Sequence, residues 1–406
     1  MMKNSSRVFL VLALLIFATA VIFKSEIRRG YFALTLFSGK EQFENFARLP
    51  EIFPSRVMAA STTPYQFPPY RGATMGLPEH FTFDGRPVAR DAFLAQTDTA
   101  ALIVLKDGAV AYENYWLSGG QDVPWLSMSV AKSFLSAAIG IAVAEGHIES
   151  IDQPITDYVP ELSQSAYGGV RIKDVLQMSS GARWNEDYSD INSDINRLGR
   201  IIALGGTLDD FVAGIARAEP PGTRLHYNSA DTQALGMLLA RATGRTVTDY
   251  MAQKLWQPLG MQSNGYWLTD EQDMEMVFFG LNATARDYAK LGELYRKEGV
   301  WRGQQIVPRD WVRASVTPDA PYLHYGASGN AIFPLGYGYQ WWVLDGDQGE
   351  YSAVGVYNQF IYVNPAERLV IVKLSAYSDY ATSHDISAYR ELETFAFFRA
   401  IGAALQ

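Results

Sequence analysis

The sequence contains no cysteine among its 406 residues, which excludes disulfide bonds, zinc–thiolate sites and thiol nucleophiles. Histidine is also scarce, with five residues, and no His-Glu-x-x-His motif or other cluster of metal ligands is present. Basic residues are the minority, because 34 Lys and Arg face 43 Asp and Glu and leave a net charge of −9. This balance argues against nucleic acid as a partner. We therefore expect no metal, no cofactor and no nucleic-acid partner.

The amino terminus carries the most apolar stretch of the chain. Lys3 and Arg7 precede an uninterrupted apolar run over residues 8–23, a pattern typical of a signal h-region or a short membrane span. A buried core helix is the alternative. We expect residues 1–30 to be a signal peptide or membrane anchor and residues 31–64 to be a stalk or linker. The remaining domain is then exported, either periplasmic or membrane-anchored outside the cytoplasm, and whether the segment is cleaved stays open.

The rest of the chain, residues 65–406, reads as one domain whose strand-rich ends enclose a helical middle. Residues 101–116 are two β-rich runs joined by a Lys-Asp-Gly turn, which predicts a hairpin. Helical periodicity dominates from about 150 to 315, and strands return over 337–344 and 359–375, the second stretch broken by an Asn-Pro turn at 364–365. An amphipathic helix is expected near 384–405. The pattern predicts one mixed sheet built from distant segments, with a helical insertion packed against it.

A serine stands one helical turn before a lysine at the start of the apolar stretch 127–146. At i and i+3, Ser129 and Lys132 lie on the same face of a helix and within reach of each other. Burial lowers the pKa of a lysine, and a neutral amine can take the proton of a serine hydroxyl. The alternative is a helix-start serine followed by a surface lysine whose stem lies along the protein. The motif alone does not decide between them.

The context of this motif resembles the serine β-lactamase and penicillin-recognising superfamily. A Ser-x-x-Lys helix follows a hairpin, and Tyr227 stands in "LHYNSADTQALGMLLARATG" (225–244) in the helical block. The class C-like branch, in particular the nylon-oligomer (6-aminohexanoate-dimer) hydrolases and their carboxylesterase relatives, is similar in further stretches. These are "VLQMSSGARWNEDYSDINSDI" (175–195), "TARDYAKLGELYRKEG" (284–299), "YQWWVL" (339–344) and "SAVGVYNQFIYVNPAERLVIVKLS" (352–375).

The resemblance implies an α/β (α+β) fold, with an antiparallel sheet flanked by helices and an inserted all-helical subdomain. It implies Ser129 as the acyl-forming nucleophile, Lys132 as its base, and Tyr227 as a partner in proton transfer whose pKa is lowered by the adjacent ammonium. The backbone N–H groups of Ser129 and Val356 would form the oxyanion hole. The substrate would be a small-molecule ester or amide.

Two departures from the β-lactamase pattern bear on the substrate. The second motif, Tyr-x-Asn, here ends in Ser229, as the nylon-hydrolase branch also does, and the third, Lys-Thr-Gly, is replaced by residues 353–355, Ala-Val-Gly. Without that lysine no cation holds the carboxylate of a β-lactam, which disfavours penicillin hydrolysis. Gly355 and Ser229 remain expected substrate contacts.

The acidic, aromatic stretch 184–194 corresponds to a loop over the active site in the nylon-hydrolase branch. We expect Tyr188 to contact substrate and Asp190 or Asp194 to attract a substrate amine; a solvated loop with an aromatic anchor is the alternative. Alternate residues of a strand point to opposite faces, so only one of Trp341 and Trp342 lines the pocket, and we assign Trp341.

Three other interpretations stay open. The chain lacks a Gly-x-Ser-x-Gly elbow, which disfavours a Ser-His-Asp hydrolase, and His226 beside the tyrosine motif is the only suggestive histidine. A β-lactamase or D-Ala peptidase is the nearest alternative enzyme. A membrane-anchored sensor of the same fold without catalysis is the third, although a degenerate site is expected to lose at least one of the three motif residues.

Overall fold

The computed structural model describes residues 41–72, 76–327, 333–380, 382 and 385–405, and before these only positions 12, 19, 21, 23, 24, 30, 31, 35–37 and 39. Within this described part, no helix has the length and apolar character needed to span a bilayer. Most of the apolar run 8–23 lies outside the described residues. The predicted signal peptide or membrane anchor stays a prediction.

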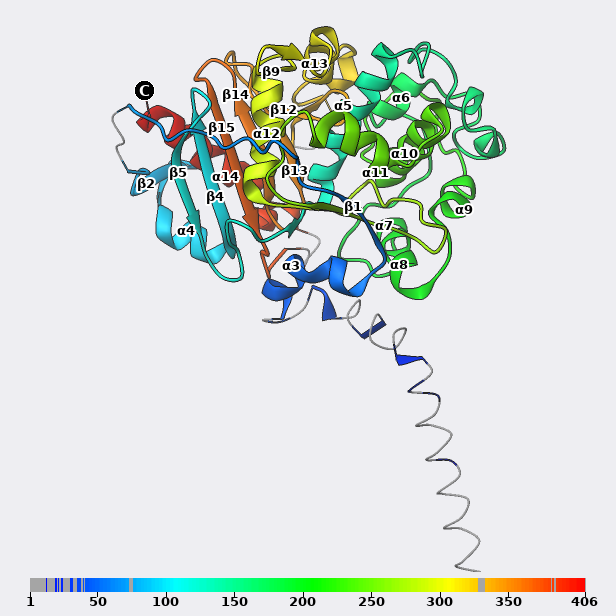
Figure 1. Ribbon diagram of the computed structural model, residues 1–406, viewed down its shortest axis with the longest axis horizontal. Helices are drawn as coiled ribbons and strands as arrows, with labels where there is room; N and C mark the ends of the chain where they lie inside the picture. The colour runs from blue at the N-terminus through cyan, green and yellow to red at the C-terminus, as the bar shows by residue number, and fades with distance from the viewer. Residues whose placement is uncertain are drawn as a thin grey trace, which may run out of the picture.

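A seven-stranded antiparallel sheet forms the larger half of the molecule (Figure 1). The predicted hairpin is present and places two strands at one edge, joined by Asp107 and Gly108, which both have positive φ. The predicted Asn-Pro turn near 364 also joins two paired strands. In spatial order the strands are β11 (Gly336–Tyr337), β12 (Trp342–Val343), β13 (Tyr351–Gly355), β14 (Gln359–Asn364), β15 (Leu369–Ser375), β4 (Thr99–Lys106) and β5 (Ala109–Tyr115).

Both faces of this sheet are apolar, because every residue of β4, β14 and β15 is buried. Alternate side chains divide between two cores: Ile103 belongs to one, with α12 (Ala285–Arg296), and Leu102 to the other, with α4 (Arg90–Gln96) and α14 (Glu391–Ala404). Close contact of α12 with the sheet needs a glycine, since a Cβ on Gly292 would come within 2.6 Å of Val370 Cγ1. The fold class expected from the sequence is confirmed.

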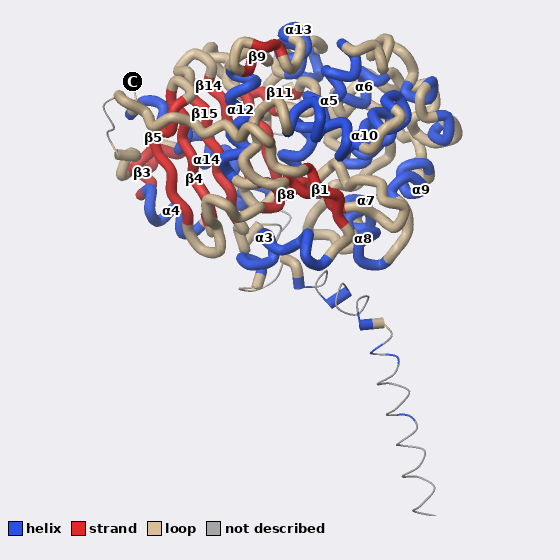
Figure 2. Tube along the Cα trace, in the orientation of Figure 1, coloured by secondary structure: helices blue, strands red, loops and turns tan. Residues whose placement is uncertain are grey.

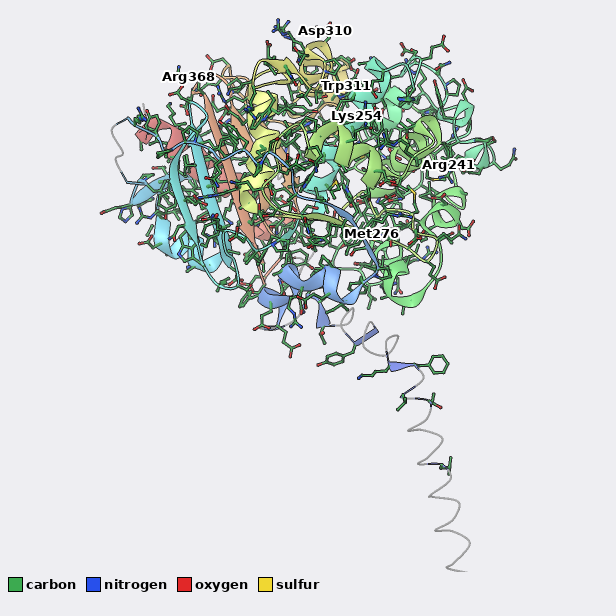
Figure 3. All side chains as sticks on the ribbon, viewed as in Figure 1. Arg241, Lys254, Met276, Asp310, Trp311 and Arg368 are labelled. Carbon is green, nitrogen blue, oxygen red and sulfur yellow. The ribbon has the colours of Figure 1, made fainter. Side chains whose placement is uncertain are left out.

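Helices make up the other half of the molecule, on the side away from β5 (Figure 2). Arg241 on α10 lies on the outside of this half and forms ion pairs with Glu161 and Asp209 (Figure 3). The expected end of the helical insertion is at about residue 315. The insertion ends earlier in the chain, because α12 already packs on the sheet. The helices are α6 (Ile172–Leu176), α7 (Asp194–Gly199), α8 (Ile201–Leu204), α9 (Leu208–Ala213), α10 (Ser229–Thr243), α11 (Val247–Met251) and the π-helix η4 (Ala252–Trp256), with the 3₁₀ turns η2 (Ile155–Asp157) and η3 (Pro160–Leu162).

A second, four-stranded sheet that the sequence did not predict joins the two halves. Its order is β1 (Ser55–Met58), β7 (Gly265–Leu268), β8 (Leu281–Ala283) and β6 (Trp125–Leu126). Helix α3 (Gln42–Ile52) packs beside it and buries Phe46 and Leu49 completely in the main core. The expected stalk over 31–64 is therefore wrong for residues 42–58, because they supply core side chains and a paired strand.

The remaining described elements are peripheral to these layers. They are β2 (His80–Phe83) and β3 (Arg86–Ala89), β9 (Val300–Trp301) and β10 (Gln304–Gln305), α13 (Arg309–Ser315), and the 3₁₀ turns η5 (Pro321–Leu323) and η6 (Ile386–Tyr389).

Asp287 at the start of α12 is a buried carboxylate on which several segments converge. It accepts hydrogen bonds from the backbone N–H groups of Gln262 (2.8 Å) and Ser263 (3.0 Å) and from the Thr284 hydroxyl (3.0 Å). Lys290 Nζ, equally buried, lies 2.8 Å from it, and burial lowers the pKa of that lysine. The pair satisfies charges that would otherwise be costly in the core.

We expect Asp287→Ala to lower the free energy of unfolding by about 3–5 kcal/mol, because the substitution leaves a buried ammonium without its counter-ion. Urea denaturation followed by circular dichroism measures the change. Asp91→Ala, which removes a largely exposed partner of Arg90, is the matched control and should leave the unfolding midpoint in place. A loss below about 1 kcal/mol for Asp287→Ala would show that the pair is not needed for stability.

Candidate active site

Ser129 lies in the 3₁₀ turn η1 (Met128–Val130), between strand β6 and helix α5 (Ala131–Ala144). The turn is held from both sides: Ser127 N–H donates to Leu281 O at 2.8 Å, and Tyr288 OH donates to Trp125 O at 2.7 Å. Met128 adopts a positive φ of 47°, an uncommon conformation for a non-glycine residue that a packed surrounding must maintain. The serine is therefore presented by a strained turn on a rigid frame.

Lys132 is buried, with 1% of its surface exposed, and its amine has three oxygen partners. Its Nζ lies 3.0 Å from Ser129 Oγ, 3.1 Å from Ser229 Oγ and 2.9 Å from the carbonyl oxygen of Phe278. Burial lowers its pKa to about 7, against an opposing effect of the Glu186 carboxylate. A substantial fraction of the amine is therefore neutral near pH 7, the form in which it can accept a proton.

Tyr227 is the third residue that the structure brings to this place. Lys132 Nζ lies 5.3 Å from the centroid of its ring, which stacks on Trp342 at 5.1 Å. Burial raises the pKa of Tyr227, the Glu186 charge raises it further, and a hydrogen bond with Ser129 opposes this. The expectation that the ammonium lowers this pKa is wrong, because desolvation of the phenolate is the larger effect. The phenol keeps its proton.

Glu186 is a member of the site that sequence reasoning missed. Ser229 donates to it twice, from Oγ to Oε1 at 2.6 Å and from N to Oε2 at 3.0 Å. Tyr188 OH donates to Oε1 at 2.6 Å, and Trp184 Nε1 donates to Oε2. The carboxylate therefore links the loop 184–194 to the lysine through Ser229. Its only sequence signal is the spacing of Trp184, Glu186 and Tyr188 at every second residue.

The end of β13 lies directly against the nucleophile. A Cβ on Gly355 would come within 3.0 Å of Ser129 N and 2.8 Å of Ser127 O, so only glycine allows this approach. In the described turns and loops, the N–H of the next residue, Val356, has no backbone acceptor. Val356 also lines the cavity beside Ser129. The two N–H groups expected to form an oxyanion hole thus lie on the two segments that meet here.

A largely aromatic cavity opens beside Ser129. Tyr188, Tyr227 and Trp342 line it, together with Val354 and Val356. Trp341 does not: it is fully buried on the other side of the strand, with its ring 4.5 Å from that of Tyr295. The assignment of Trp341 to the pocket is therefore wrong, and its neighbour takes that place. Phe333, Tyr380, Tyr389 and Glu391, which sequence reasoning did not select, complete the lining.

The predicted contacts Ser229, Asp190 and Asp194 do not line the cavity. Ser229 connects Lys132 with Glu186, so its hydroxyl is directed to the proton network rather than to a substrate. Asp190 Oδ1 accepts from Asn192 N at 2.9 Å, and Asp194 Oδ2 accepts from Asn185 N at 3.0 Å. Both aspartates therefore stabilise the backbone of their own loop. The expectation that one of them faces a substrate amine finds no support in these contacts.

Comparison with known proteins assigns the fold and the family. Residues 90–395 match the beta-lactamase family. The 6-aminohexanoate-dimer hydrolase of Paenarthrobacter ureafaciens is 30% identical over 298 residues, which are 72% of this chain and 76% of that protein. A Bacillus anthracis protein solved as a candidate 6-aminohexanoate-dimer hydrolase superposes with a TM-score of 0.79, at 22% identity over 91% of this chain and 95% of that one. EstCE1, a hydrolase with promiscuous acyltransferase activity, superposes at 0.59, with 17% identity over 78% and 96% of the two chains.

The reactivity of Ser129 should depend on the ionisation of Lys132. We expect the rate of labelling by a fluorophosphonate probe to rise with pH through a midpoint at about 7, as the amine loses its proton. Glu186→Gln should move the midpoint to lower pH, because the carboxylate favours the ammonium form and raises the pKa of Lys132. Labelling rates measured across a pH series give both midpoints.

Asp190→Asn is the matched control for this shift, since that carboxylate bonds within its own loop and should leave the midpoint unchanged. A midpoint that stays in place or rises in Glu186→Gln would contradict the electrostatic link between the two groups.

Proposed function

The chain belongs to the beta-lactamase family of serine hydrolases, and we propose on that basis that it cleaves ester or amide bonds through a covalent acyl-enzyme formed on Ser129. The observation that carries the proposal is the 3.0 Å contact between Ser129 Oγ and a buried lysine amine whose pKa lies near 7. Such an amine is the base that a serine hydroxyl needs to become a nucleophile.

Acylation begins with transfer of the Ser129 proton to the neutral Lys132 amine. The serine oxygen then attacks the substrate carbonyl, and the negative charge that develops on the carbonyl oxygen is stabilised by the N–H groups of Ser129 and Val356. Because Phe278 O and Ser229 Oγ also contact Lys132 Nζ, the ammonium that forms keeps acceptors for its protons. The buried charge is therefore compensated while the tetrahedral intermediate exists.

Tyr227 acts in this scheme as a proton donor to the leaving group. Its raised pKa means that the phenol is protonated throughout the working pH range, so it donates rather than accepts in the first half-reaction. Lys132 returns the proton to Tyr227 when the leaving group departs. Water then attacks the acyl-enzyme and gives a proton to Lys132. As the acyl–serine bond breaks, Lys132 passes that proton to Ser129 Oγ, and the acid product leaves.

The cavity wall favours acyl groups without a negative charge over β-lactams. Val354 lines the cavity on β13. Its neighbour Ala353 stands where the β-lactamase motif would supply a lysine. Aromatic side chains form most of the remaining wall, a surface suited to an alkyl or aryl chain. We place this chain with the ester- and amide-cleaving relatives, among which the Paenarthrobacter ureafaciens protein is a 6-aminohexanoate-dimer hydrolase.

The catalytic assignment predicts a specific pattern of loss. Wild-type protein should be labelled by a fluorophosphonate and should hydrolyse short p-nitrophenyl esters, and Ser129→Ala should lose both. Lys132→Ala should reduce turnover by about a thousandfold or more with an unchanged circular dichroism spectrum, because the serine then lacks its base. Nitrocefin should be cleaved far more slowly than the esters, since no cation holds its carboxylate.

Retained ester hydrolysis in Lys132→Ala would reject the lysine as base. Absence of labelling and of hydrolysis in the wild type would reject the hydrolase and favour a sensor of the same fold.

We also propose that the domain is exported, directed by the apolar run 8–23 after Lys3 and Arg7. A protein expressed with a reporter fused at its carboxyl terminus should then be found outside the cytoplasm, in the periplasm or attached to the membrane face there. Removal of residues 1–30 should leave the fusion in the cytoplasm, as judged by cell fractionation. A full-length fusion that fractionates with cytoplasmic markers would refute the proposal.

A further inference from the structure

The second oxyanion donor of the proposed mechanism lies in a tight turn between two strands. Gly355 at the end of β13 pairs with Gln359 at the start of β14, so residues 356–358 form the whole connection. Val356, whose N–H group is that donor, is the first of the three. The direction of this N–H group therefore depends on how the turn is held.

The backbone of the turn is strained. Tyr357 and Asn358 have φ angles of 62° and 67°. Asparagine adopts this left-handed conformation comparatively often, whereas a bulky aromatic residue rarely does. Two such residues in succession persist only where the surrounding structure fixes them. The turn therefore needs contacts outside its own backbone.

The side chain of Gln359 supplies the nearest of these contacts. It is fully buried, and its Nε2 lies 3.3 Å from Val356 O, 2.9 Å from Tyr357 O and 2.6 Å from Ser375 O. Ser375 N donates to Oε1 of the same amide at 3.0 Å, which fixes the orientation of the amide. Gln359 thus ties two carbonyl groups of the turn to the neighbouring strand β15.

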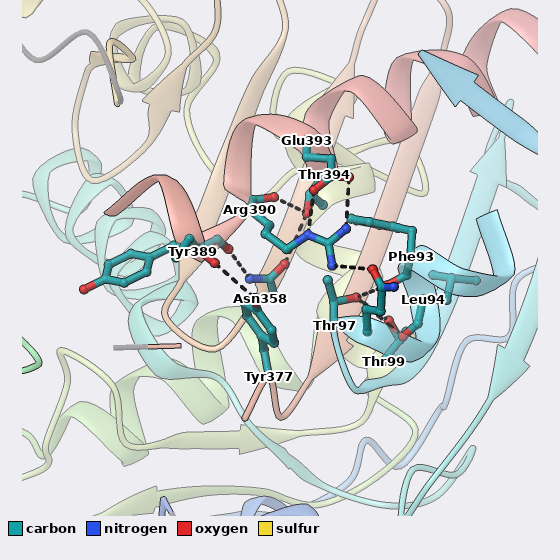
Figure 4. A network of polar contacts seen from close by, with 12 residues as sticks. Phe93, Leu94, Thr97, Thr99, Asn358, Tyr377, Tyr389, Arg390, Glu393 and Thr394 are labelled. Atoms are coloured by element: carbon teal, nitrogen blue, oxygen red, sulfur yellow. Dashed lines mark hydrogen bonds and ion pairs between the residues drawn. The ribbon is translucent and has the colours of Figure 1, made fainter. Parts of the chain in front are cut away.

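Asn358 and Tyr357 hold the turn on its other sides. Asn358 Nδ2 donates to the carbonyl oxygen of Tyr389 at 2.7 Å, and Thr394 Oγ1 donates to Asn358 Oδ1 at 3.2 Å (Figure 4). The Tyr357 ring stacks on that of Phe37 with centroids 4.7 Å apart. The turn is therefore held from three directions, by β15, by α14 with the residues before it, and by the segment before α3.

We propose that Gln359 and Asn358 are positioning residues that aim the Val356 N–H group at the carbonyl oxygen of the substrate. Neither is among the described residues that line the cavity, so both act through the turn. An oxyanion donor is effective only when it lies about 2.7–3.1 Å from the developing charge, so a small rotation of its peptide plane weakens catalysis. The proposal rests on the hydrolase function proposed above and extends it from the donor to the groups that hold the donor.

Gln359→Met tests this role, because methionine keeps the length of the side chain and removes its hydrogen bonds. We expect a fluorophosphonate to label the folded variant completely but at least about tenfold more slowly than the wild type, since the phosphoryl oxygen of the probe also needs the oxyanion donor. The pH midpoint of labelling should stay at about 7, because the contacts of Lys132 are unchanged. With p-nitrophenyl butyrate, kcat should fall by a similar factor and KM should stay nearly constant.

Asn364→Ala is the matched control. Asn364 is a buried side-chain amide at the opposite end of β14, so its loss should leave the labelling rate and kcat unchanged. Asn358→Gly keeps a residue that accepts positive φ and removes both side-chain hydrogen bonds. This variant should slow labelling by a smaller factor, and it serves as the test if Gln359→Met does not fold.

Labelling of the folded variant at the wild-type rate overturns the inference. Incomplete labelling at the wild-type rate overturns it too, because that result reports only a loss of folded protein. An equal loss of rate in Asn364→Ala, or a shifted pH midpoint in Gln359→Met, would likewise contradict a specific effect on the oxyanion donor. Absence of labelling and of hydrolysis in the wild type would instead reject the proposed function itself.

Discussion

The buried contact between an amine and a hydroxyl one helical turn apart governs how the rest of the protein is built. An ammonium group in a protein core is costly unless it is paired or loses its proton, and Lys132 has a lowered pKa together with three oxygen acceptors. Its partners come from three separate parts of the chain, at residues 129, 229 and 278. Burial of this side chain is therefore favourable only when the sheet half, the helical half and the loop before β8 are all folded. Folding of the protein and formation of the site are coupled in this way.

Two opposing electrostatic effects act on the pKa of that amine. Desolvation moves the pKa of Lys132 down, and the negative charge of Glu186, which Ser229 holds by hydrogen bonds, moves it up. The same desolvation acts on Tyr227 in the opposite sense and keeps the phenol protonated. One apolar environment thus produces a base and an acid from two side chains whose ordinary pKa values are both near 10.

The sequence predicted what depends on local pattern and missed what depends on packing between distant segments. The sequence predicted three features that each depend on residues only two to four positions apart. They are the hairpin around Asp107, the turn near residue 364 and the Ser129–Lys132 pair. Pairing of β1 with β7 was not predictable, because its partners are over two hundred residues apart and both strands are short. Strand alternation showed that only one of the two adjacent tryptophans lines the cavity, but the choice of face depends on which core forms on which side. Glu186 resembles any acidic loop residue until the loop folds back on Ser229.

The four-stranded sheet limits where the chain can be cut by a protease without loss of the fold. Strand β1 pairs with β7 and contacts α11, and α3 before it contributes Phe46 and Leu49 to the main core. A processing protease that cut the chain after Met58 would leave β7 with an unpaired edge and a hole beside Trp125, whose ring lies 5.5 Å from that of Phe46. Proteolytic trimming that preserves an intact domain is thus confined to positions upstream of Gln42.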